Sequence, residues 1–303
     1  SLSSGSNTFE LKYSGSNTGT GVGLFYEGGT GANIVNRTNV KLTDTVGTTA
    51  GLIGVYTAGG GKLTNNAKIT GDKGYGIISN GAEVENTSDI TLTNPLTASK
   101  PSVGILTQAG NKITNTGTVT VGNNSVGIFG KEIVQKGIVT VGNGGTGLYS
   151  EGGNVTLDST SKINTGSNKA VGVFTKGAGQ TITANAGSTM TIGDSSFGFL
   201  NEGKGNTINS NVANQILRND GTYIYSSDKS GTVNNNTTLT STGSYNYGLY
   251  SAGTVTNNAD INFGTGVGNV GIYSIAGGNA TNGTSTIRPT IRVSKSDTVN
   301  KLY

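Results

Sequence analysis

Few residues of this chain could carry out catalysis, because the sequence contains no histidine and no cysteine. Thiol nucleophiles, disulfides and cysteine-bound zinc are therefore excluded, and the commonest general base is missing. Carboxylate chemistry remains, in which two acidic groups flank a glycosidic bond. The nearest pair is Asp220 and Asp228, on either side of a short stretch around Tyr223. The sequence shows no column of such carboxylates, so we predict a protein that is not an enzyme and needs no cofactor.

The residues best suited to binding lie in two irregular stretches of the sequence. The insertion at 93–102 holds two of the three prolines, which cannot pair in a central strand and therefore predict a loop. The stretch at 211–230 gathers arginine, tyrosine and aspartate, residue types common at interface hot spots. The predicted binding residues are Lys100, Pro101, Arg218, Asn219, Asp220, Tyr223, Tyr225, Asp228 and Lys229. The alternative is that the second stretch is a decayed repeat without function.

Both stretches interrupt a short apolar motif that recurs along the chain, for example as Val126-Gly127-Ile128-Phe129. Its central positions are Gly23, Gly54, Gly76, Gly104, Gly127, Gly147, Gly172, Gly198, Tyr223, Gly248 and Gly271. Successive centres are 20 to 31 residues apart, a period typical of solenoids. Glycine-rich and serine-rich chains are often disordered, but here the apolar residues recur in register.

One repeat contains three short strands separated by Gly/Asn corners. In the repeat that begins at Val103, the expected strands are 103–106, 112–115 and 118–121. This order predicts an all-β, right-handed parallel β-helix of about eleven coils. Residues 1–303 are expected to form a single segment of a longer protein, with regular coils over 20–275 and an irregular end, or the start of a further coil, over 276–303.

The alternation of side chains along a strand predicts which residues face the core. The residues on each side of the glycine, such as Val126 and Ile128, are expected to point inward. The glycine and the following aromatic residue are then expected to point outward, with each ring lying over a glycine of the adjacent coil. The alternative is that the outer aromatic row forms a platform for stacking carbohydrate.

Two further columns are predicted from residues at equivalent positions. Asparagines that follow an apolar residue by two positions are expected to stack and to hydrogen-bond from coil to coil. They are Asn36, Asn65, Asn86, Asn115, Asn235 and Asn257. Four residues after successive glycines stand charges of alternating sign, which are expected to attract one another weakly. They are Lys131, Glu151, Lys176 and Glu202.

The charge pattern argues against nucleic-acid binding. The net charge of +4 comes from lysines scattered along the repeats, whereas a nucleic-acid binder clusters its basic residues on one face. No apolar run is long enough to span a membrane, and no signal peptide is recognisable. We expect a monomer that does not insert into a membrane.

The repeat resembles a known family. The stretch 112–121, followed by Val126-Gly127-Ile128-Phe129, is similar to the passenger repeats of large fusobacterial type V autotransporter adhesins (RadD-like), over about 20–275. The resemblance implies an extracellular rod on the bacterial cell surface, tethered to the outer membrane by a barrel outside this chain. It also implies attachment to a host-cell receptor or glycan, or to a surface protein of another bacterium. The absence of cysteine fits unfolded export.

The expected function is therefore binding and display, without catalysis. Two alternatives stay open: a polysaccharide-degrading or tailspike-like β-helix enzyme, and a purely structural spacer within a longer adhesin. The sequence identifies neither the ligand nor the position of this segment along the rod.

Overall fold

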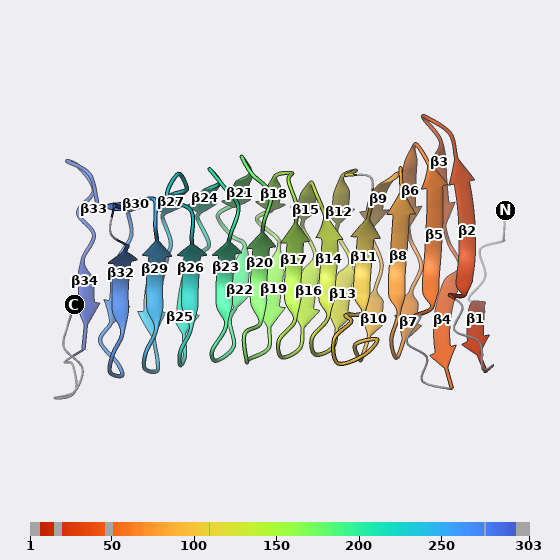
Figure 1. The fold of residues 1–303 in the computed structure, drawn as a ribbon, viewed down its shortest axis with the longest axis horizontal. Helices are drawn as coiled ribbons and strands as arrows, with labels where there is room; N and C mark the ends of the chain where they lie inside the picture. Colours follow the sequence, from red (N-terminus) through yellow and green to blue (C-terminus); the bar gives the residue numbers. More distant parts are fainter. Residues whose placement is uncertain (1–6, 15–19, 46–50, 109, 276, 295–303) are drawn as a thin grey trace.

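The chain forms a right-handed parallel β-helix built from three sheets that run along the whole molecule (Figure 1). The computed structural model describes residues 7–14, 20–45, 51–108, 110–275 and 277–294, and every regular element in them is a strand. All paired strands in these sheets run parallel. The predicted fold class is confirmed.

We name the first sheet the aromatic sheet. Its eleven strands are β2 (Val22–Gly28), β5 (Ile53–Gly59), β8 (Tyr75–Asn80), β11 (Val103–Thr107), β14 (Val126–Gly130), β17 (Thr146–Ser150), β20 (Val171–Thr175), β23 (Phe197–Asn201), β26 (Thr222–Ser226), β29 (Tyr247–Ser251) and β32 (Val270–Ser274). Each begins one copy of the recurring motif.

We name the second sheet the asparagine sheet. Its eleven strands are β3 (Asn33–Asn36), β6 (Lys62–Asn65), β9 (Glu83–Asn86), β12 (Ile113–Asn115), β15 (Ile133–Gln135), β18 (Val155–Leu157), β21 (Thr181–Ala184), β24 (Thr207–Ser210), β27 (Thr232–Asn235), β30 (Thr254–Asn257) and β33 (Asn279–Asn282).

The third sheet is divided into two parts, and we name it the split sheet. Its first part is β1 (Thr8–Tyr13), β4 (Asn39–Asp44), β7 (Ile69–Gly71), β10 (Ile90–Leu92), β13 (Thr118–Val121), β16 (Ile138–Val141), β19 (Lys162–Thr165) and β22 (Thr189–Thr191). Its second part is β25 (Asn214–Leu217), β28 (Thr238–Ser241), β31 (Ile261–Phe263) and β34 (Ile291–Val293). The division falls in the coil that contains the irregular stretch 211–230.

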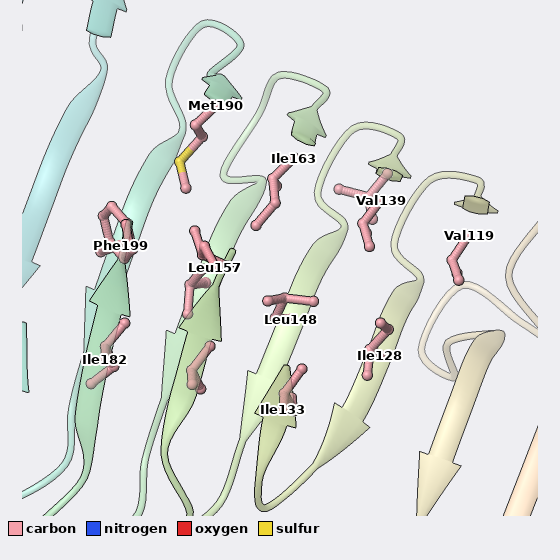
Figure 2. Close-up of a cluster of buried hydrophobic side chains, with 14 of the residues drawn as sticks. Val119, Ile128, Ile133, Val139, Leu148, Leu157, Ile163, Ile182, Met190 and Phe199 are labelled. Atoms are coloured by element: carbon pink, nitrogen blue, oxygen red, sulfur yellow. The ribbon is translucent and has the colours of Figure 1, made fainter. Parts of the chain in front are cut away.

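The core is a stack of aliphatic rows, one from each sheet (Figure 2). Ile128 of the aromatic sheet, Ile133 of the asparagine sheet and Val139 of the split sheet meet within one coil, and each is completely buried. Their equivalents repeat this arrangement in the next coil, beginning with Leu148. The prediction that the residue after the glycine points inward is therefore confirmed.

The predicted directions of the glycine and of the residue before it are wrong. Val126 lies half-buried on the outer face, and Gly127 faces the core. A Cβ atom at Gly127 would lie 2.7 Å from Cγ1 of Val139 and 2.6 Å from the carbonyl oxygen of Gly147. The simple alternation fails because Gly127 and Ile128 are consecutive inward positions, and the strand pairing passes over the glycine. Only a residue without a side chain fits this position.

The predicted asparagine column forms a buried hydrogen-bonded ladder. Except in Asn115, each Nδ2 atom donates to the Oδ1 atom of the asparagine one coil further on, at 2.7 Å from Asn36 to Asn65 and from Asn65 to Asn86. The bond from Asn86 to Asn115 is 2.8 Å long, and the bond from Asn235 to Asn257 is 2.7 Å long. Because second N–H groups also bond to a carbonyl two residues on, these buried amides are satisfied.

Candidate binding surfaces

The predicted loop lies at the corner between the split sheet and the aromatic sheet, where 93–102 joins β10 to β11. Lys100 and Pro101 are exposed at its end, and Leu96 is buried. A Cβ atom built on Gly51 would lie 2.8 Å from the Leu96 side chain. The loop is thus anchored to the rod by Leu96 and presents Lys100 and Pro101 to solvent.

The second irregular stretch reaches the same corner of the rod, because Arg218, Asn219 and Asp220 join β25 to β26. All three residues are exposed. In the aromatic sheet, β26 lies five strands beyond β11, which corresponds to about 24 Å at the usual strand spacing. The two irregular stretches therefore lie on one corner of the rod but do not form one pocket.

Tyr223 is completely buried and cannot contact a partner, contrary to the prediction. It occupies the place of the inward glycine, and its ring packs edge-to-face on Phe199 with 5.6 Å between centroids. Its hydroxyl lies 2.6 Å from Ser210 Oγ and 3.4 Å from Thr237 Oγ1. Burial raises the pKa of Tyr223 to about 12, although both hydroxyl partners oppose the shift. Tyr223 is a core residue of the irregular coil.

Asn219 and Asp220 belong to a repeating corner turn. Asn219 Oδ1 accepts a hydrogen bond from the backbone N–H of Ser244, one coil further on, at 3.1 Å. Asn123 and Asn143 make the same bond earlier in the rod, at 2.8 Å in each case. Asp220 has a φ of 53°, a left-handed conformation shared by corner residues of other coils. Both residues support the rod, a role that the recurring Asn and Ser at this position could have indicated.

Asp228 and Lys229 lie at the other end of β26, at the corner that leads to the asparagine sheet. Asp228 Oδ1 accepts hydrogen bonds from the Ser230 hydroxyl and from the backbone N–H groups of Gly205 and Ser230, and these bonds, the hydroxyl bond above all, hold the pKa of Asp228 below its usual value. Five strand residues separate the corner of Asp220 from that of Asp228, about 16 Å at 3.3 Å per residue. Paired glycosidase carboxylates are about 5–9.5 Å apart, so these two groups do not form such a pair.

Tyr225, the remaining predicted residue, belongs to a much larger surface on the outer face of the aromatic sheet. We name this surface the aromatic strip and define it by two outward rows. The first row is Val22, Ile53, Tyr75, Val103, Val126, Thr146, Val171, Phe197, Thr222, Tyr247 and Val270. The second row is Phe25, Tyr56, Ile78, Leu106, Phe129, Tyr149, Phe174, Leu200, Tyr225, Tyr250 and Tyr273. The sequence predicts only the second row to face outward, because simple alternation of side chains places the first row in the core.

The rings of the strip stack on one another, and the predicted ring-over-glycine packing is not found. Tyr250 stacks on Tyr225 with 4.7 Å between centroids and on Tyr273 with 4.9 Å, with interplanar angles of 16° and 12°. Phe129 and Tyr149 stack at 4.7 Å. Tyr149 and Phe174 meet edge-to-face at 4.7 Å, and aliphatic residues interrupt the row, but within the stacked groups each ring face lies against the next ring and the solvent meets mainly ring edges. This geometry disfavours the alternative in which sugars stack on the ring faces.

The four predicted charges line one edge of the strip. Lys131, Glu151, Lys176 and Glu202 each follow a strip residue by two positions, and all four are exposed. The hydroxyl of Tyr149 donates to Glu151 Oε1 at 3.0 Å, which holds the carboxylate at the hydroxyl end of this ring. Desolvation, followed by this hydrogen bond, raises the pKa of Tyr149 to about 12.

The predicted attraction within this charged column is not realised as ion pairs. Within the described part of the chain, none of its four members has an oppositely charged group within 4 Å. Ion pairs between neighbouring coils occur elsewhere, as between Lys112 and Glu132 at 3.5 Å. The four side chains at the strip therefore project into solvent with unpaired charge.

A metal site and a membrane-spanning helix are two further features that a chain of this kind could contain. The described residues contain no group of three or more acidic side chains placed to bind a metal ion. In the same part of the chain, no helix has the length and apolar character needed to cross a membrane. No family model matches the chain, and no curated protein or solved structure shows significant similarity to it.

Proposed function

We propose that this chain is a segment of a bacterial surface adhesin that attaches its cell to other bacteria, or to host-cell receptors or glycans, by binding without catalysis. It acts as an extracellular rod, with the aromatic strip as its contact surface. The resemblance of the repeats to autotransporter passengers supports the location.

The observation that carries this proposal is the extent of the aromatic strip. Soluble monomers rarely expose contiguous apolar patches larger than a few hundred Å². The strip runs along all eleven strands of the sheet, and only Thr146 and Thr222 in its two rows are polar. Phe25 and Tyr273, on the two end strands, are 59% and 40% exposed, whereas most of the other members are half-buried and Ile53, Ile78, Val103, Val171 and Thr222 are buried. A surface of this kind is typical of a protein that contacts another molecule.

The spacer alternative is less well supported, because a spacer needs no apolar outer face. The enzyme alternative lacks a carboxylate pair, since Asp220 and Asp228 lie at opposite ends of one strand. The corner that carries Lys100, Pro101 and Arg218 could add specificity, because these exposed residues break the regularity of the rod.

Adhesion of protein-coated beads tests the proposal. Beads coated with the chain should bind bacterial or epithelial cells, whereas albumin-coated beads should not. The double variant Tyr149→Ser with Phe174→Ser changes only outward residues and should reduce attachment at least about tenfold, as expected when hot-spot side chains are lost. The matched control is Thr183→Ala with Thr207→Ala on the outer face of the asparagine sheet, which should attach normally.

Two results would contradict the proposal. If wild-type beads attach no better than albumin beads, the chain is not an adhesin segment for those cells. If the strip variant and the control variant attach equally well, attachment does not use the strip.

A further inference from the structure

The aromatic strip and its charged edge have the properties of a surface that binds a copy of itself. The inference rests on the proposed role of the strip as a contact surface, and it identifies the partner. Its starting point is the order of the charges: Lys131 on β14, Glu151 on β17, Lys176 on β20 and Glu202 on β23. Reading this alternating series backwards exchanges every sign, so the series is complementary to its own reverse.

We propose that the aromatic strip is the interface between two antiparallel copies of this chain. A twofold axis parallel to the strands, midway between β17 and β20, brings the two strips face to face and reverses the order of the coils. Lys131 then lies opposite Glu202 of the second copy, and Glu151 lies opposite Lys176. The four charges, unpaired within one copy, form four reciprocal pairs across the interface, as an isologous contact requires.

The charges also exclude the neighbouring registers. If one copy slides by a single coil, Lys131 faces Lys176 of the other copy and Glu151 faces its own equivalent, so like charges oppose. In a parallel dimer the charged edge would face the opposite edge of the strip. At that edge the coils of Lys176 and Glu202 carry Lys169 and Asp194, charges of the same sign, and the coils of Lys131 and Glu151 carry only uncharged residues. Only the antiparallel register pairs all four charges.

The same axis places a ring opposite an aliphatic side chain in three of the five reciprocal pairs of the aromatic row, whereas Tyr149 faces Phe174 and Tyr56 faces Tyr273 in the other two. Tyr250 is placed opposite Ile78 of the second copy, Tyr225 opposite Leu106, and Phe129 opposite Leu200. Bulky rings thus face aliphatic side chains at these positions. Phe25, on the first strand of the sheet, is the member of this row left without an opposite residue. Ten of the eleven coils overlap, and the uncharged row beside the rings is apolar except at Thr146 and Thr222.

The size of this overlap suits a stable dimer. Ten coils at about 4.8 Å give a length of about 48 Å, and the five-residue span from Val126 to Lys131 gives a width of about 16 Å. Each copy would therefore cover roughly 800 Å², which is the contribution of one partner to an interface of standard size. A dimer would replace the monomer that the sequence predicts.

Charge exchange provides a direct test by sedimentation in solution. The all-acidic variant, Lys131→Glu with Lys176→Glu, should sediment as a monomer at concentrations where the wild type is dimeric. The all-basic variant, Glu151→Lys with Glu202→Lys, should also be monomeric. Mixed in equal amounts, the two variants should form a heterodimer, because every pair is then restored. The dissociation constant of each variant alone should rise at least about tenfold above that of the wild type.

A matched control is Lys136→Glu with Lys162→Glu, which changes the net charge equally at exposed positions away from the strip. It should dimerise like the wild type. A monomeric wild type, or charge variants that dimerise unchanged, would overturn the inference. Loss of dimer in both variants without recovery in the mixture would overturn the antiparallel register. Since sedimentation requires no cells, failure here is distinct from failure of the bead assay.

Discussion

At the scale of single residues, the column of inward glycines explains how the chain is divided between core and surface. Each glycine allows a close approach between its coil and the next, and a side chain there would collide with a backbone carbonyl and with the split sheet. The residue before it is consequently left on the outside. Because the glycine and the residue after it both point inward, the residue before the glycine points outward and forms the first row of the aromatic strip, on which both proposals depend.

Equivalent positions of the asparagine ladder differ in how completely their buried polar groups are hydrogen-bonded. Asn86 is bonded on both sides, donating to Asn115 and accepting from Asn65. Gln135 ends this part of the ladder, because the next coil has Leu157 in the same place. Its Oε1 atom accepts from Asn115 at 3.0 Å, but its buried Nε2 atom has no hydrogen-bond partner.

We predict opposite outcomes for the same substitution at these two positions. Asn86→Leu should lower the free energy of unfolding by about 2–4 kcal/mol, because it leaves a buried donor and a buried acceptor unpaired. Gln135→Leu should change it by no more than about 1 kcal/mol, because the cost of removing the acceptor of the Asn115 amide is offset by removal of the unpaired buried N–H group of Gln135. Denaturant unfolding of both variants provides the measurement. If the two variants lower the free energy of unfolding equally, the hydrogen bonds of the ladder do not determine the loss of stability.

At the scale of elements, the irregular coil is where the split sheet divides. There β25 pairs with β28 but not with β22. In this coil Tyr223 replaces the glycine, and the buried Gln215 stands in the row occupied by Leu239 and Ile261 in the following coils. The large ring fills the core, and its hydroxyl needs the polar partners Ser210 and Thr237. The irregular stretch is thus an internal repacking of the rod as well as a change in its surface.

The burial of Tyr223 predicts a specific sensitivity to alkaline pH. Its pKa of about 12 in the folded protein exceeds the ordinary value of about 10 expected after unfolding. The contribution of Tyr223 to the free energy of unfolding is therefore fully present below about pH 10 and is lost as the pH rises through about 12. The loss attributable to Tyr223 is on the order of 3 kcal/mol.

The measurement is the free energy of unfolding as a function of pH, compared between the wild type and Tyr223→Phe. The variant retains the ring but cannot ionise, so the part of the alkaline loss due to Tyr223 should disappear. The bond between Ser210 and Thr237, at 2.7 Å, remains available to both hydroxyls. Identical pH profiles for the two proteins would contradict the assigned cause.

The elements could be predicted from sequence to a considerable extent, because a solenoid repeats its pattern. The period of the glycine motif indicates the fold, and Asn65 and Asn86 indicate the ladder. The first row of the strip could not be recognised, since the rule of alternation places Val126 inward and does not allow for two consecutive inward residues at Gly127 and Ile128. The predicted site failed at Tyr223 for a related reason. Replacement of a core glycine by tyrosine signals a buried ring, whereas its residue type suggested an interface.

At the scale of the whole molecule, the parallel stack determines the shape and also the possible ways of assembly. Ten steps between eleven strands at about 4.8 Å give a body about 48 Å long before the ends are added. Figure 1 shows the strands of the aromatic sheet side by side along the long axis of the molecule, where they form one face of a rod. Two such rods can associate along this face or end to end, and the two arrangements differ in length.

Small-angle scattering should therefore distinguish the proposed dimer from an end-to-end assembly. In the antiparallel dimer, each copy extends beyond the other by one coil, so the length along the rod axis should exceed that of the monomer by only about 5 Å. The cross-section should grow instead, because two bodies lie side by side. The all-acidic variant supplies the monomer reference under the same conditions. A wild-type dimer about twice as long as this variant would show association through the ends, and a compact, isotropic particle would contradict the rod itself.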